Sequence, residues 1–89
     1  MNRTLARVTL ADRALRPHQR LVMLTLCHLC PSDSDKLRTT SRYLAWLCNM
    51  SPRAIGYSIQ MLERLGYITR FQPYRSCPTE YTLHPHRSR

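Results

Sequence analysis

The stretch Thr40–Gly66, TSRYLAWLCNMSPRAIGYSIQMLERLG, decides the fold because it predicts two helices joined by a tight turn. The first helix is expected to begin at Thr40 or Ser41, whose side-chain oxygens can accept hydrogen bonds from first-turn amides. Asn49 ends it, because Asn tolerates the left-handed conformation of a helix end. The residues expected to point toward the core are Leu44, Ala45, Leu47, Cys48 and, at the corner, Met50.

The second helix has a strong start signal in Ser51 followed by Pro52. Ser is a favoured N-cap, and Pro at the first helical position lacks only an amide that has no partner there. Apolar residues then recur at steps of four and three, which predicts one buried face and one polar face. The buried face comprises Ile55, Ile59 and Leu62, and the other carries Arg53, Gly56, Tyr57, Gln60 and Arg64.

A helix is also predicted before this stretch, from Pro17 to about Cys30, with Pro31 ending it. It is apolar nearly all round, so it is either central in its domain or covered by a partner. Three apolar rows exceed what two neighbouring helices need in a small domain, and this motivates a homodimer hypothesis. The rows are Leu21, Leu24 and His28; Val22, Leu26 and Leu29; and Met23, Cys27 and Cys30.

The sequence after Gly66 predicts a β-hairpin. Residues 67–71 and 81–84 alternate in the manner of two strands, and the loop 72–78 between them has Pro at both ends. Residues 37–39 are expected to form a short strand that pairs with this hairpin. The likeliest inward residues are Ile68, Tyr81 and Leu83, and the hairpin carries Arg70, Tyr74 and Arg75.

The ends of the chain are less informative. Residues 1–15 fit a short strand, a helical turn or a basic arm with Arg3 and Arg7, and the sequence does not distinguish these. Residues 16–85 form the predicted domain, and residues 86–89 form a basic tail. The 89 residues suffice for one compact core but not for two.

The charge balance favours a nucleic-acid partner. The chain carries a net charge of +9, from 14 basic residues against 5 acidic ones, and every basic residue except Lys36 is Arg. Arg presents a planar fork that matches phosphate oxygens and the guanine edge. From Lys36 to Thr79 the only acid is Glu63, so positive charge concentrates in the predicted helix pair and hairpin. The alternative is a solvated basic surface.

Several function classes have little support. The apolar stretch Leu21–Leu26 is too short to span a bilayer, and no signal-peptide pattern is present, so we expect a cytoplasmic protein without membrane contact. The carboxylates have no spacing typical of an acid and base pair, so we expect no enzyme. Cys27 and Cys30 form CxxC inside a predicted helix rather than a knuckle turn, which favours packed thiols over a zinc site. We therefore expect no metal, no cofactor and no small-molecule ligand.

The order of residue types resembles the winged helix-turn-helix family, in particular the small domains of phage and plasmid replication and regulatory proteins. The resemblance covers roughly residues 16–85. The chain departs from the family pattern at Ala54, where Thr is common, and in a hairpin without Gly. The matching residues are Leu44-Ala45, Asn49-Met50-Ser51, Ala54-Ile55, Leu62-Glu63 and Leu65-Gly66-Tyr67-Ile68.

The resemblance implies an α+β winged helix-turn-helix fold, with a three-helix core and a C-terminal β-hairpin wing. It also implies double-stranded DNA as the partner, with the second motif helix in the major groove. Expected groove contacts are Ser51, Pro52, Arg53, Gly56, Tyr57 and Gln60; expected backbone and wing contacts are Arg38, Thr40, Arg42, Arg64, Arg70, Tyr74 and Arg75.

Two of these residues have structural alternatives. Gly56 either lets the helix approach the groove or makes a close packing contact, and Tyr57 either donates to a phosphate or packs on the wing. The function expected from the resemblance is a transcriptional regulator of a phage, plasmid or other mobile element. The alternatives are a DNA-binding module in replication or partition, and a winged-helix protein-interaction module.

Overall fold

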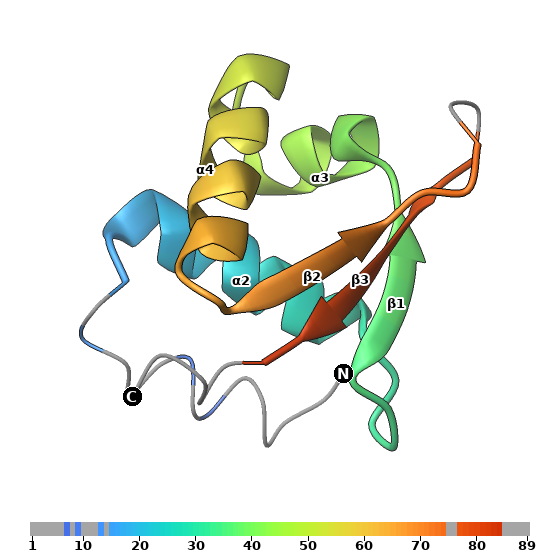
Figure 1. Ribbon diagram of the computed structural model, residues 1–89. Helices are drawn as coiled ribbons and strands as arrows, with labels where there is room; N and C mark the ends of the chain where they lie inside the picture. The colour runs from blue at the N-terminus through green and yellow to red at the C-terminus, as the bar shows by residue number, and fades with distance from the viewer. Residues whose placement is uncertain (1–6, 8, 10–12, 14, 75–76, 85–89) are drawn as a thin grey trace.

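The fold combines three helices with a three-stranded antiparallel sheet. A computed structural model describes residues 7, 9, 13, 15–74 and 77–84 of the chain. The elements in chain order are α2 (Pro17–Leu29), β1 (Lys36–Thr39), α3 (Ser41–Cys48), α4 (Pro52–Arg64), β2 (Ile68–Phe71) and β3 (Thr79–Leu83). Figure 1 shows the helices packed together, with the sheet running past them to the hairpin loop. The α+β class predicted from the sequence is confirmed, and the arrangement is compatible with a winged helix.

The sheet has the strand order β1-β3-β2, so the central strand is the last one in the chain. Tyr81 of β3 lies between Leu37 of β1 and Arg70 of β2, and this row faces the helices. The next row, Arg38, Glu80 and Phe71, therefore points to the opposite face, because successive side chains on a strand alternate. The predicted pairing of residues 37–39 with the hairpin is confirmed.

The core lies between the three helices and the inner face of the sheet. All three helices pack against one another, and α4 also packs on β2. The predicted inward residues of α4 and of the hairpin are buried, and α2 contributes five buried residues of its 13. The most completely enclosed side chains include Val22, Met23, Leu26, Leu44, Ile55, Ile59, Leu62, Tyr67, Tyr81 and Leu83. Two of the three apolar rows of α2 therefore supply residues to the core.

The caps predicted from local chemistry are present. Thr40 Oγ1 accepts a hydrogen bond from the Tyr43 amide, and Ser51 Oγ accepts one from the Ala54 amide, each at 3.1 Å. Asn49 adopts the left-handed conformation, with φ 53° and ψ 46°. Gly66 follows α4 with φ +88°, a conformation that residues with a Cβ rarely adopt. Asn49 and Ser51 thus form the turn between α3 and α4, whereas Thr40 and Gly66 mark the outer ends of the helix pair.

One core prediction in α3 is wrong. Leu47 is 37% exposed, whereas Leu44, Ala45 and Cys48 are buried. Only one narrow side of the eight-residue helix α3 contacts α2 and α4. Leu47 lies outside that side, next to Tyr43 on the helix surface. Met50 is partly buried against the core, as expected for the corner.

One row of α2 faces outward. Leu21 is 41% exposed, Leu24 is half-buried and His28 is exposed, whereas the other two rows supply core residues. Residues 1–6, 8, 10–12 and 14, with Arg3, lie outside the described part of the chain. Arg7 and Thr9 are helical, and Thr9 is buried with its hydroxyl 3.7 Å from Cys27 Sγ on α2. Within the described ranges, the helices are all too short or too polar to cross a membrane.

Candidate nucleic-acid interface

The outward face of α4 is formed by the residues predicted for the major groove. Arg53, Gly56, Tyr57, Gln60 and Arg64 are all exposed, and Tyr57 retains 63% of its surface. The opposite face is buried in the core. Ser51 and Pro52 are also exposed at the start of the helix. All six residues predicted as groove contacts are therefore exposed, four of them on one face of α4 and two at its start.

Gly56 has open space where a side chain would stand. A Cβ built on Gly56 meets no atom within 4 Å. The alternative that Gly56 serves a close packing contact inside the molecule is thus wrong. Tyr57 lines a space between α4 and the start of α2, as described below. Both residues leave the outward face of α4 accessible.

Arg70, predicted as a backbone contact, is held by Glu63. Its Nη2 and Nε donate to Glu63 Oε1 at 2.7 Å and 3.1 Å, which ties β2 to the last turn of α4. The hydrogen bonds to Glu63 raise the pKa of the Arg70 guanidinium. Sequence reasoning missed this pair, because it is formed only when β2 folds back alongside α4.

Arg38 lies on the far side of the sheet from α4. It shares the outer row with Glu80, and its Nε is 3.7 Å from Glu80 Oε2. Thr40 and Arg42, by contrast, are exposed at the start of α3. The predicted backbone contacts therefore do not form one surface: the structure separates Arg38 from the others.

The hairpin loop presents aromatic side chains. Phe71 and Tyr74 are both largely exposed. Gln72 Nε2 donates to the Cys77 carbonyl at 2.8 Å, which closes the base of the loop. Arg75 lies outside the described residues. Phe71 was not predicted as a surface residue, because its position in an alternating strand is compatible with either face.

A stacked aromatic pair on α3 was also missed. The rings of Tyr43 and Trp46 are 6.1 Å apart between centroids and inclined by 17°. Trp46 is 74% exposed, which is unusual for so large an apolar side chain. The spacing of three residues on a helix was the available signal, since residues three apart are neighbours on its surface.

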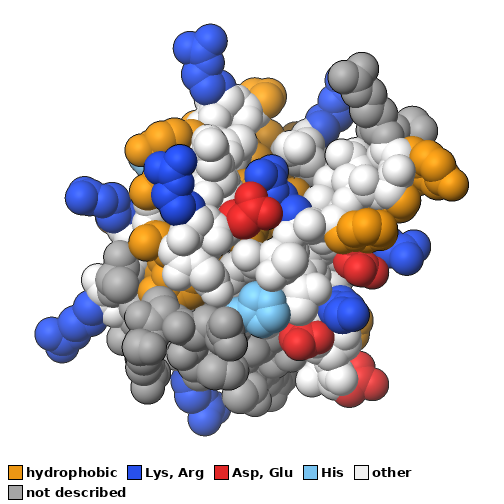
Figure 2. Space-filling view, in the orientation of Figure 1, with side chains coloured by type: hydrophobic (Ala, Val, Ile, Leu, Met, Phe, Trp, Pro, Cys, Tyr) orange, Lys and Arg blue, Asp and Glu red, His pale blue; other side chains and the backbone are white. Residues whose placement is uncertain are grey.

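The basic residues dominate the face of the molecule drawn in Figure 2. Lys and Arg side chains stand out around its helical side, and the few carboxylates lie over the centre and toward the sheet. Two of the described carboxylates, Glu63 and Glu80, are engaged with Arg70 and Arg38. The outward ridge of α4 itself carries no carboxylate, since Glu63 lies at its edge beside β2.

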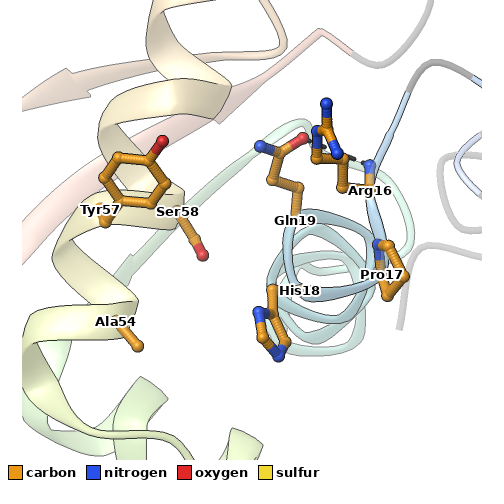
Figure 3. A pocket seen from close by; sticks show the side chains of 7 residues that line it. All are labelled: Arg16, Pro17, His18, Gln19, Ala54, Tyr57 and Ser58. Carbon is orange, nitrogen blue, oxygen red and sulfur yellow. Dashed lines mark hydrogen bonds between the residues drawn. The ribbon is translucent and has the colours of Figure 1, made fainter.

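A hollow lies beside the same ridge, between α4 and the start of α2. It has a volume of about 360 Å³. Figure 3 shows His18 and Gln19 reaching toward it from α2, and Tyr57 and Ser58 from α4. The Arg16 amide donates to Gln19 Oε1 at 3.3 Å, which orders the first turn of α2. The lining residues are Arg16, Pro17, His18, Gln19, Ala54, Tyr57 and Ser58. Sequence reasoning assigned no role to Arg16 or His18.

The cysteines are packed thiols. Cys27, Cys30 and Cys48 are buried, and none of the four cysteines forms a disulfide. Burial raises the pKa of the Cys27 and Cys30 thiols, so both resist ionisation. The Cys30 thiol donates to the Ser34 carbonyl at 3.1 Å. In the described ranges, no three His, Cys, Asp or Glu side chains gather in a way that could hold a metal ion.

Comparison with known proteins adds no relative: no family model, curated protein or solved structure matches the chain.

Proposed function

We propose that the chain is a sequence-specific double-stranded DNA-binding protein of the winged helix-turn-helix type. Its role is that of a non-catalytic transcriptional regulator, acting in the cytoplasm and encoded by a phage, plasmid or other mobile element. The motif resemblance in residues 40–68 supports this proposal. The order helix, strand, helix, helix, strand, strand and the strand order β1-β3-β2 support its fold.

The observation that carries the proposal is the outward ridge of α4. This ridge is exposed along its length, bears Arg53 and Arg64, and has a gap at Gly56. A helix with its side chains is about 10–12 Å across, and the major groove of B-DNA is about 12 Å wide. In this pose Arg53 lies near the leading end of the helix, where its guanidinium can donate two hydrogen bonds to a guanine.

The experiment that tests the proposal is the selection of bound sequences from a random duplex pool. We expect one motif to be enriched by the wild-type chain and not by the Arg53→Ala variant. If the wild type enriches no motif, the proposal of sequence-specific binding is refuted. A palindrome with half-sites one or two helical turns apart favours the regulator, whereas tandem repeats favour a replication or partition module.

A homodimer on the target site is part of the proposal. The outward row of α2 supplies an apolar surface at Leu21, and Leu47 on α3 supplies another. Both lie close to the α2–α3 contact at which Thr25 Oγ1 is 3.3 Å from Cys48 Sγ. Sedimentation with and without DNA tests this. A monomer at high concentration under both conditions would contradict it.

A second candidate function is protein interaction through α3. The stacked pair of Tyr43 and Trp46 favours it, because aromatic side chains are enriched in protein interfaces. Comparing Trp46→Ala with Arg53→Ala separates the two. The DNA-binding proposal expects Arg53→Ala to abolish biological activity and Trp46→Ala to preserve most of it; the reverse pattern favours the interaction module.

A further inference from the structure

The two flanks of α4 are built differently. Ala54, Tyr57 and Ser58 lie on the flank that faces the start of α2, whereas Glu63 lies on the flank that faces β2. A helix that fills the major groove has one sugar–phosphate strand of the duplex along each flank, because its diameter matches the groove width. Each flank therefore meets a DNA backbone when the ridge between them enters the groove.

The hollow on the α2 flank is largely apolar, with a serine hydroxyl on its α4 side. Ser58 is only 3% exposed, and Figure 3 shows its hydroxyl directed into the space between the two helices. A hydroxyl in this position can donate a hydrogen bond to, or accept one from, a polar group that enters the hollow.

The rim and walls of the hollow define the chemistry of that group. Arg16 supplies a permanent positive charge, and the His18 ring supplies an N–H donor in either tautomer. Pro17, Ala54 and the Tyr57 ring form apolar walls, and no carboxylate lines the space. An anion attached to an apolar ring matches this combination, and a deoxyribose with its phosphate is such a unit.

We propose that the hollow between the start of α2 and α4 holds one sugar–phosphate unit of the DNA backbone, with Arg16 and His18 on the phosphate. This inference rests on the proposed DNA binding and names a contact outside the helix-turn-helix pair and the hairpin. Tyr57 then serves both surfaces, since it lies on the outward ridge and also lines the hollow.

The test compares two double variants, each of which removes one cationic side chain and one histidine: the first at the start of α2, the second at the end of α2 and in β1. The double variant Arg16→Ala with His18→Ala removes the guanidinium and the imidazole from the rim of the hollow. Lys36→Ala with His28→Ala removes one cation and one imidazole that are exposed elsewhere. The Arg16 amide remains to bond Gln19 in the first variant, so the helix start is preserved. Circular dichroism checks that both variants are folded.

Affinity is measured by fluorescence anisotropy on the selected duplex, at salt concentrations from about 50 to 200 mM. We expect the hollow variant to bind about tenfold more weakly than wild type, as a lost charge-assisted hydrogen bond predicts. Its slope of log K against log salt should fall by about 1, for one lost phosphate contact. The control variant should stay within about twofold of wild type.

A duplex with single neutral methylphosphonate linkages locates the contact. At one linkage, neutralising the phosphate should weaken binding by the wild type. The same linkage should not further weaken binding by the hollow variant, because that variant already lacks the side chains that contact this phosphate. If the hollow variant matches the control in affinity and slope, the assignment of the hollow is overturned and DNA binding stands. If the wild type binds no duplex at all, the proposed function and this inference both fail.

Discussion

The two flanks of α4 differ in whether a carboxylate lies beside their basic side chains. On the β2 flank, Glu63 and Arg70 form a closed pair with a 2.7 Å hydrogen bond. On the α2 flank, Arg16 and His18 border a hollow without a carboxylate. The basic side chain of the first flank is paired with a carboxylate within the molecule, whereas the lining of the second includes none.

This difference shows why counting basic residues is a poor guide to a binding surface. Arg38 and Arg70 looked like backbone contacts in the sequence, but each faces a carboxylate. No role was predicted for Arg16 from the sequence, yet it lies next to the exposed ridge of α4. A carboxylate near the phosphate path also repels DNA, so the β2 flank contributes less attraction than its arginine suggests.

The largest effect is expected from the ridge between the flanks. Arg53→Ala should weaken specific binding by about tenfold to a hundredfold, since a bidentate guanine contact contributes about 1–3 kcal/mol of discrimination. Anisotropy on the selected duplex and on single-base variants measures this. The preference at one base pair should disappear. An unchanged preference at every position would show that Arg53 reads no base.

Neutralising Glu63 should make the β2 flank resemble the α2 flank. Glu63→Gln removes the carboxylate that holds Arg70, so DNA affinity should rise by about threefold to tenfold and the salt slope should steepen by about 1. The unfolding free energy should fall by less than about 1 kcal/mol, because the pair is partly solvated.

Glu80→Gln is the matched control for that variant. It makes the same charge change on the outer face of the sheet, where Glu80 lies opposite Arg38. Affinity should stay within about twofold of wild type. Equal gains from both variants would mean that net charge alone, and not the flank of α4, controls binding.

Gly56→Ala should change the stability of the fold and its affinity for DNA in opposite directions. The added Cβ meets open space, so replacing Gly in a helix interior should raise the unfolding free energy by about 0.4–1 kcal/mol. DNA affinity should fall by about threefold, because the Cβ stands between α4 and the groove floor. Thermal unfolding and anisotropy measure the two effects. A gain in both would contradict close approach at Gly56.

The smallest effect is expected from Arg38. Arg38→Ala should change DNA affinity by less than about twofold, since the sheet lies between its side chain and α4. The same titration used for the other variants measures it. A loss comparable to that of Arg53→Ala would place the outer face of the sheet on the DNA.

Much of the fold was predictable because local chemistry determines it. The caps at Thr40 and Ser51 and the turn at Asn49 depend on residues close in the chain, and all three are present. The spacing of Ile55, Ile59 and Leu62 identified the buried face of α4, and therefore also its outward ridge.

The flanks of α4 were not predictable, because they depend on how distant segments dock. The Glu63–Arg70 pair requires β2 to return along α4, and the hollow requires the start of α2 to lie beside Tyr57. The orientation of Arg38 depends on the register of β1 with β3. Leu47 was misplaced because a short helix in contact with two others buries a narrower arc than its apolar residues suggest.

The most direct test of the central claim, that α4 and its α2 flank bind duplex DNA, is a chemical-shift map. The backbone amide signals of the isotope-labelled chain are compared with and without the selected duplex. We predict the largest changes in residues 16–19 and 51–60, with residues 36–39 nearly unchanged. Changes centred on Tyr43 and Trp46 or on the outer face of the sheet, with α4 unaffected, would contradict the account.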